Sequence, residues 1–241
     1  MATTRQEPPP PTRLAQPSAL RIYGPPRHTL ADRAYQSIRV AIVNQELQPD
    51  RYYSEAWLAG EMGISRTPIH AALLQLEIEG MVQIEAQRGF RLRLISGEEH
   101  DEFFEIRLIL EANVLRRLCP KADEDVIATL WELCDRQRRA IGEPVLFTDL
   151  DEGFHRYLAE AAGLHRTAAI IHSLRGLLWL GTAHRPTSER ERAVTEHSAI
   201  VEAVAKRNAA AAVDALERHL RGSQQRWRRR ETRRLEALST P

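Results

Sequence analysis

The chain has 241 residues, of which 43% are hydrophobic and 28% charged, with a formal net charge of +1 at pH 7. This length allows two domains that each bury a core, and the near-neutral charge excludes a protein that coats nucleic acid through charge alone. The absence of a run of ~18 apolar residues excludes a membrane-spanning helix, and with no signal peptide and only Cys119 and Cys134 we expect a cytoplasmic protein without a membrane partner.

The N-terminal segment begins with a tail and continues into helical sequence. Residues 1–27 are rich in proline and lack hydrophobic periodicity, which predicts a disordered tail. From Leu30 to Ile42 apolar residues recur at helical spacing and predict a first amphipathic helix. Ser54 is placed to cap a second helix that continues through Glu61.

The stretch from 58 to 94 has the layout of a winged helix-turn-helix. Gly63 supplies a turn, the Ser65 hydroxyl is placed to cap the next helix, and Gly80 ends that helix. Alternating apolar residues then predict two strands, joined through Gln87, Arg88 and Gly89, with inward positions at Val82, Ile84, Phe90, Leu92 and Leu94. We therefore expect residues 28–96 to form a DNA-binding domain whose second helix lays its N-terminal end in a major groove.

The sequence beyond residue 97 predicts helices only. Periodic apolar positions and breaks at proline and glycine delimit six helices, at 98–118, 122–141, 144–162, 166–183, 187–207 and 209–235. Helices joined by short loops pack as an antiparallel bundle. The expected fold class is mostly α, with a winged helix-turn-helix and its small β-hairpin at 28–96 followed by an all-α antiparallel bundle at 97–236.

Four side chains in the helical half are candidate metal ligands. Asp151 and His155 are spaced i, i+4 and so emerge from one helix face. His197 and His219 follow on the last two predicted helices, and ligands from different helices can converge inside a bundle. Three imidazoles and a carboxylate suit a divalent cation such as Zn²⁺, Ni²⁺ or Mn²⁺. The alternative is a polar network without metal. His100, by contrast, is expected to be exposed.

The winged segment resembles the GntR family of bacterial transcription regulators. The resemblance lies in the string Gly63-Ile64-Ser65-Arg66-Thr67-Pro68-Ile69 and continues through Ala72-Leu73 and Glu79-Gly80 to Arg88-Gly89. His70-Ala71 departs from the Arg-Glu that this family usually carries, which makes the operator sequence an open question. The DNA-contacting residues that we infer are Ser65, Arg66, Thr67, His70, Arg88 and Gly89.

The helical half resembles the FCD effector domain of the FadR subgroup. The resemblance implies that Asp151, His155, His197 and His219 occupy the metal-ligand positions of its metal-binding members. It also implies that Arg107 faces the effector cavity, where a guanidinium can grip a carboxylate. The alternative for Arg107 is an i, i+4 pair with Glu111 at a domain or dimer surface.

The combined pattern predicts a regulator, most often a repressor in this family, that senses a small organic acid through a metal-containing helical domain. We expect a homodimer that binds a palindromic double-stranded operator, since a two-fold dimer calls for a two-fold site. We expect no enzymatic activity, because no nucleophile motif, Gly-rich phosphate loop or HExxH string is present. The alternatives are a metal-dependent hydrolase fused to a DNA-binding domain and an architectural DNA binder without effector.

Overall fold

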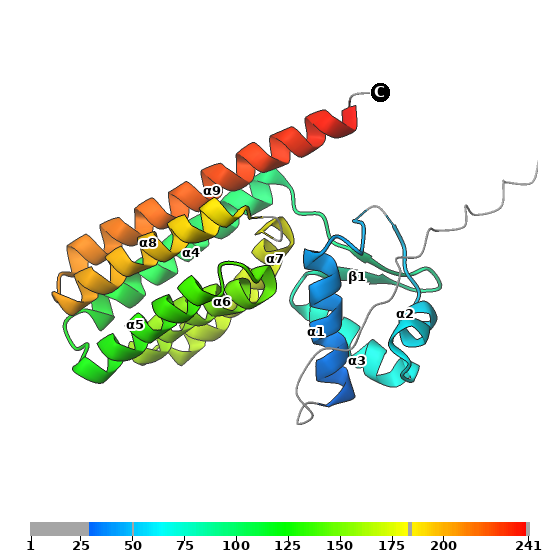
Figure 1. Ribbon diagram of the computed structural model, residues 1–241, viewed down its shortest axis with the longest axis horizontal. Coiled ribbons are helices and arrows are strands. Elements are labelled where there is room, and N and C mark those ends of the chain that lie inside the picture. The colour runs from blue at the N-terminus through cyan, green and yellow to red at the C-terminus, as the bar shows by residue number, and fades with distance from the viewer. Residues whose placement is uncertain (1–28, 50, 183–184, 240–241) are drawn as a thin grey trace, which may run out of the picture.

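A computed structural model describes residues 29–49, 51–182 and 185–239 (Figure 1). The described chain forms two lobes, a small N-terminal one with a β-hairpin and a larger one built from long helices. The disordered tail predicted for residues 1–27 lies outside the described residues. No described helix combines the length and the apolar composition that crossing a membrane requires.

The N-terminal lobe is a three-helix unit with a two-stranded wing. Its elements are α1 (Leu30–Val43), α2 (Glu55–Met62), α3 (Arg66–Ile78), β1 (Val82–Glu85) and β2 (Gly89–Leu92). The strands are antiparallel, with Val82 opposite Leu92 and Ile84 opposite Phe90. The core of this lobe gathers apolar residues from every element, among them Ile38, Leu58, Ile69, Leu73 and Phe90. The winged helix-turn-helix fold is confirmed.

Local sequence signals explain where these helices begin and end. The Ser54 hydroxyl accepts a hydrogen bond from the Trp57 amide, and Gly63 ends α2 in the left-handed conformation, with φ 64°. The prediction that the Ser65 hydroxyl caps α3 is wrong: Ser65 is the N-cap residue, but its side chain makes no capping hydrogen bond. Ser65 is exposed, so water can satisfy the first-turn amides. Leu94 lies beyond the strands, is 58% exposed, and does not extend the wing as predicted.

The C-terminal lobe is an antiparallel bundle that contains helices alone among its described residues. Its elements are α4 (Gly97–Leu118), α5 (Glu124–Arg139), α6 (Pro144–Ala161), α7 (His165–Thr182), α8 (Thr187–Ala205) and α9 (Ala209–Ser239). These bounds fall within a few residues of the six predicted helices. Helices α4, α8 and α9 lie side by side, and α5, α6 and α7 pack beneath them (Figure 1).

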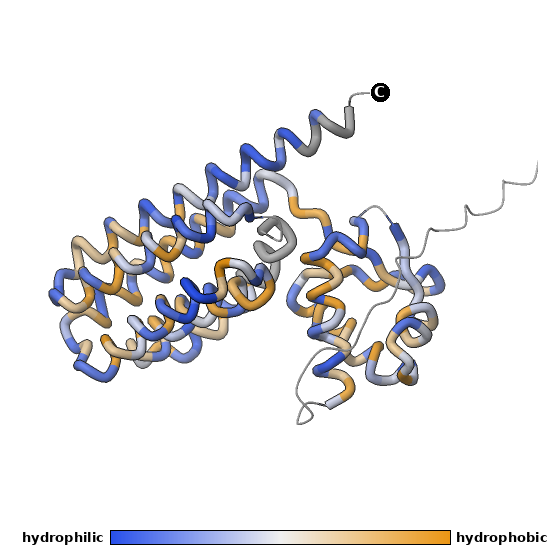
Figure 2. Tube along the Cα trace, viewed as in Figure 1, coloured by the Kyte–Doolittle hydropathy of each residue, from blue (hydrophilic) through white to orange (hydrophobic). Residues whose placement is uncertain are grey.

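Apolar residues face the inside of the bundle and polar ones the outside, as Figure 2 shows along the long helices. Leu115, Phe154, Ile200 and Leu216 are among the fully buried residues of this core. The two lobes have separate cores, because the hydrophobic clusters of the bundle and of the winged unit share no buried residue. Because the core of the bundle is apolar, the polar residues buried within it are candidates for a functional site.

Candidate metal centre and nucleic-acid interface

Three histidines from three helices meet inside the bundle. His155 comes from α6, His197 from α8 and His219 from α9, and each side chain is nearly fully buried. The Nε2 atom of His197 lies 3.2 Å from that of His155 and 3.3 Å from that of His219. One ring nitrogen from each residue falls within 4.8 Å of the others. The three residues that the spacing singled out are thus brought together by the packing of distant helices.

Each of these imidazoles is oriented by a second polar residue at its other nitrogen. The Nδ1 contacts are His155 with Glu111 Oε2 at 2.5 Å, His197 with Gln137 Oε1 at 2.8 Å and His219 with Glu196 Oε2 at 2.7 Å. The Gln137 amide donates its own N–H to the Leu150 carbonyl at 3.0 Å, which directs its oxygen toward His197. All three partners are acceptors, so each neutral ring carries its proton on Nδ1.

This proton arrangement makes the centre of the cluster a candidate cation site. With Nδ1 protonated, all three Nε2 atoms present lone pairs, and lone pairs facing one another cannot form hydrogen bonds. A metal ion would satisfy all three. Tetrahedral zinc with Zn–N bonds of 2.0–2.1 Å separates its nitrogen ligands by about 3.3 Å, which matches the 3.2 and 3.3 Å observed. The donor set and its geometry therefore fit a divalent metal.

The Asp151 carboxylate borders this cluster. Its Oδ1 atom lies 3.5 Å from His197 Nε2, and its Oδ2 atom lies 3.7 Å from a guanidinium nitrogen of Arg185. Asp151 is 2% exposed and comes from the same helix as His155, one turn earlier. The carboxylate is in position to act as a fourth ligand, although it lies outside the convergent group formed by the three histidines.

Arg107 and Glu111 form an ion pair inside the bundle. Arg107 Nε donates to Glu111 Oε1 at 2.8 Å, and both residues are 2% exposed. The pair that we considered for a surface therefore exists, but it is buried, and the surface alternative is wrong. The other oxygen of Glu111 accepts a hydrogen bond from His155, so a single carboxylate connects Arg107 to the three-histidine cluster.

Glu196 is held in its charged form beside His219. Burial alone would raise the pKa of this carboxyl, but the hydrogen bond from His219 and the nearby Arg226 guanidinium outweigh burial and hold the pKa below its usual value. Arg226 donates to Glu196 at 3.2 Å. A carboxylate that stays ionised accepts the His219 proton firmly and keeps Nε2 available to a metal.

The expected DNA-contacting residues of α3 form an exposed group at its N-terminal end. Ser65, Arg66, Thr67 and His70 are all exposed, and the Arg66 side chain is 70% exposed. Glu55 of α2 contacts His70 Nδ1 at 2.8 Å and lies 3.9 Å from an Arg66 guanidinium nitrogen. Glu55 was not anticipated from the sequence, since it becomes a partner only when the turn at Gly63 folds α2 against α3.

The wing presents a second basic group. Arg88 lies at its tip with a side chain 70% exposed, and the guanidinium groups of Arg88 and Arg91 lie 5.8 and 5.5 Å from the Tyr52 ring centroid. Gly89 adopts φ +99°, and a Cβ there would lie 2.1 Å from the Tyr53 carbonyl oxygen. Only glycine therefore allows the turn that carries Arg88 out into solvent.

His100 contradicts its predicted exposure. It is 1% exposed at the start of α4 and stacks on Trp227 of α9, with 3.5 Å between ring centroids. Burial lowers the pKa of His100 to about 3. The prediction failed because the acidic residues next to His100 in the sequence suggested an exposed helix face. In the folded chain α9 covers the face that carries His100.

Sequence reasoning missed the residues that orient the metal cluster. Gln137, Glu196 and Arg185 were not singled out, and Glu111 was considered only as a partner of Arg107. One signal was available, since Glu196 directly precedes His197. No local spacing relates Gln137 to His197, which is 60 residues away.

Comparison with family models matches both lobes. The model described as "Bacterial regulatory proteins, gntR family" matches residues 30–92, and the model described as "FCD domain" matches residues 102–222. The two matches together span the winged lobe and most of the helical bundle.

Curated relatives match over most of their own length. The chain is 27% identical to the HTH-type transcriptional repressor RspR of Escherichia coli K12, with 81% of this chain and 87% of the relative covered. It is 31% identical to an uncharacterized HTH-type transcriptional regulator of Streptomyces ambofaciens, with 78% and 80% covered. It is 26% identical to the repressor NanR of Enterobacter sp. strain 638, with 83% and 86% covered.

Solved structures share the fold. E. coli McbR/YncC superposes with a TM-score of 0.71 at 15% identity, over 85% of this chain and 99% of that one. A GntR-type regulator from Rhodococcus sp. RHA1 superposes with a TM-score of 0.67 at 22% identity, over 82% and 96%. The two-lobed arrangement described above is therefore also found in experimentally determined structures.

Proposed function

Because the chain belongs to the gntR family of bacterial regulatory proteins and carries an FCD domain, it is a DNA-binding transcription regulator, and we propose that it senses a small organic acid at a metal centre in the bundle. We assign DNA binding to residues 28–96 and effector binding and dimerisation to residues 97–236. The names of its relatives, RspR and NanR among them, support repression.

The observation that carries this proposal is the convergence of three Nε2 lone pairs at 3.2 and 3.3 Å. His155, His197 and His219 would hold the metal, and Asp151 would complete the protein ligands. Three imidazole donors with a carboxylate favour Zn²⁺, Ni²⁺ or Mn²⁺ over hard cations such as Mg²⁺. When bound, the metal supplies an electrophilic centre to which an effector carboxylate can coordinate.

The balance of charges around the three histidines favours an anionic effector. The charges of the buried residues Arg107, Glu111 and Asp151 and of the partly buried Arg185 sum to zero, and Arg226 neutralises Glu196. A bound divalent metal adds two positive charges, and uncompensated charge is costly inside a protein. One carboxylate group offsets half of this added charge and a dicarboxylate offsets all of it, and Arg107 is the residue that we assign to the effector carboxylate.

Two winged lobes in a homodimer would read a palindromic operator, with Ser65, Arg66, Thr67 and His70 at the major groove and Arg88 and Gly89 on the flanking backbone.

A hydrolase built on the same metal gains no support from the relatives, which are named as transcription regulators. An architectural DNA binder without effector would differ by failing to bind any acid at the metal.

The test is a calorimetric titration of chelator-treated protein, first with Zn²⁺ and then with a panel of small carboxylic acids. We expect about one zinc per chain, and at least one acid that binds only the zinc-loaded protein. Arg107→Gln should lower the affinity for that acid and leave the zinc stoichiometry unchanged. Arg117→Gln, at an exposed position on the same helix, should change neither quantity. If zinc binds but no acid in the panel binds the zinc-loaded protein, the architectural alternative is favoured.

A further inference from the structure

A single buried arginine joins the winged lobe to the metal-bearing helix. Arg39 of α1 is 5% exposed, and its guanidinium lies 2.8 Å from Asp149 and 3.8 Å from Glu152, both on α6. Burial alone would lower the pKa of Arg39, but these two carboxylates outweigh it and raise the pKa. A buried charge is costly to leave unpaired, so this contact resists separation of the two lobes.

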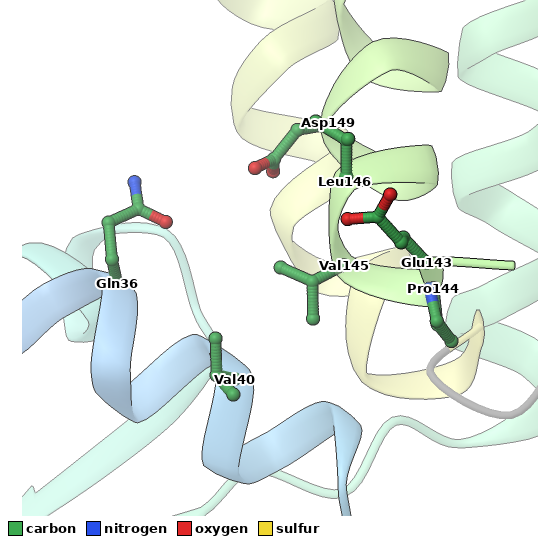
Figure 3. A pocket seen from close by; sticks show the side chains of 7 residues that line it. All are labelled: Gln36, Val40, Glu143, Pro144, Val145, Leu146 and Asp149. Atoms are coloured by element: carbon green, nitrogen blue, oxygen red, sulfur yellow. The ribbon is translucent and has the colours of Figure 1, made fainter. Parts of the chain in front are cut away.

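An apolar contact accompanies the ion pair. Val145 of α6 packs against the hydrophobic core of the winged lobe rather than that of the bundle. Figure 3 shows Val145 and Asp149 facing Gln36 and Val40 of α1 across a crevice of about 420 Å³. The ion pair therefore sits beside a partly open junction, which leaves room for α1 and α6 to shift against each other.

The same helix presents its two functional sets on adjacent faces. Val145, Asp149 and Glu152 are spaced i, i+4, i+7 and face α1, whereas Asp151 and His155 face the metal cluster. At 3.6 residues per turn these two faces lie roughly 100° apart around α6. A movement of α6 that brings Asp151 and His155 onto a metal therefore also moves the partners of Arg39.

The contact continues from Arg39 to the recognition helix. The Arg39 guanidinium lies 5.5 Å from the centroid of the Tyr35 ring, one turn away on α1. The Tyr35 hydroxyl donates a hydrogen bond to Glu79 Oε2 at 2.7 Å, and Glu79 is the C-cap residue of α3. Side chains in direct contact thus lead from α6 through α1 to the end of α3.

We propose that Arg39 is a latch through which occupancy of the metal centre on α6 sets the orientation of the recognition helix α3. The inference rests on the proposed metal site and adds the route by which that site regulates DNA binding. When α6 adjusts to the metal, Asp149 and Glu152 carry Arg39 with them, because the buried guanidinium cannot leave both carboxylates at low cost. Helix α1 follows, and Tyr35 transmits the change to Glu79.

Hydrogen exchange tests the latch with Zn²⁺ alone as the probe. In the wild type, zinc should slow amide exchange in α1 and at the C-terminal end of α3, by about fivefold or more if the coupling has the size usual for allostery. Asp149→Asn should bind zinc with the same stoichiometry and lose most of this slowing. The Asp149 side chain is 37% exposed, so this substitution should leave the fold intact.

Two further variants separate a latch from a merely structural contact. Arg33→Gln removes a guanidinium from the same helix at a residue that forms no ion pair within the described chain, and it should respond to zinc like the wild type. The swap Arg39→Glu with Asp149→Arg should recover part of the slowing that Asp149→Asn loses, since it rebuilds an ion pair across the same junction.

The outcomes distinguish this inference from the proposed function. If zinc fails to bind the wild type, the metal site is wrong and the latch is overturned with it. If zinc binds but leaves α1 unchanged, or slows α1 equally in wild type and Asp149→Asn, the latch alone is overturned and the metal site stands.

Discussion

The carboxylate of Glu111 accepts a hydrogen bond from His155 Nδ1 at 2.5 Å, across 44 residues of sequence. This contact holds the proton on Nδ1 and turns Nε2 toward the other two histidines. Glu111 also receives the Arg107 guanidinium at 2.8 Å, so one buried carboxylate orients both a proposed metal ligand and the proposed effector ligand.

Replacement of Glu111 should weaken metal binding without removing any of the proposed metal ligands. Glu111→Gln leaves His155 in place but substitutes a neutral acceptor for the carboxylate, so zinc affinity should fall by about 10–100-fold, as is typical for residues that orient metal ligands. A competition titration against a chelator of known affinity measures this change. Glu105→Gln, at an exposed position on the same helix, is the matched control. Equal zinc affinity in both variants would show that Glu111 does not tune the site.

The histidines and Asp151 should differ in their importance for metal retention. His197→Ala or His219→Ala should abolish stoichiometric metal, whereas Asp151→Ala should retain zinc with lower affinity, because three imidazoles still hold it. Elemental analysis after chelation and reconstitution gives the stoichiometry, and circular dichroism checks that the helices remain. His165→Ala removes an exposed histidine and should bind like the wild type. Full retention of metal by His197→Ala would contradict the assignment.

The two basic groups of the winged lobe should act differently on DNA. Operator sequences selected from a random pool by the wild type provide the probe. Arg66→Ala should weaken operator binding by about 1–3 kcal/mol if its guanidinium contacts a guanine edge. Arg88→Ala should weaken specific and non-specific binding alike and reduce the salt slope by about 1.

Arg138→Ala, which removes an exposed arginine of the bundle, is the control for both DNA-binding variants. It should match the wild type in operator affinity and salt slope. Operator binding by folded Arg66→Ala at wild-type strength would mean that α3 does not read the DNA with its N-terminal end.

His100 should make the protein less stable in mild acid. Its pKa falls to about 3 in the folded protein, chiefly because burial disfavours the imidazolium. Asp101 raises this pKa, whereas the charges of Arg228, Arg230 and Arg107 lower it further. The unfolded chain binds a proton near pH 6.5, so the unfolded state gains protons first and stability falls as the pH drops below about 6.5.

The comparison with His100→Phe, which preserves the aromatic stack, isolates this contribution. Between pH 7.5 and pH 5 the wild type should lose about 2 kcal/mol of unfolding free energy relative to the variant. Urea unfolding in the presence of chelator measures the difference at each pH. Parallel pH profiles for the two proteins would show that His100 is not buried in its neutral form.

The sequence by itself determined the local elements and the faces that they present. Helical spacing, Gly63 and the alternation of Val82 and Ile84 with polar residues sufficed for the winged lobe, because turns and amphipathic faces depend on neighbouring residues. The i, i+4 spacing of Asp151 and His155 likewise placed two candidate ligands on one face of α6 before any tertiary contact was known.

Only the tertiary structure decided which faces meet. The pairing of His197 with Gln137, the burial of His100 and the contact of Arg39 with Asp149 join residues from separate helices. No spacing along the chain encodes such contacts, because they depend on how the helices pack around a common core. The residues that tune the proposed metal centre and connect it to the DNA-binding lobe therefore emerged only from the folded chain.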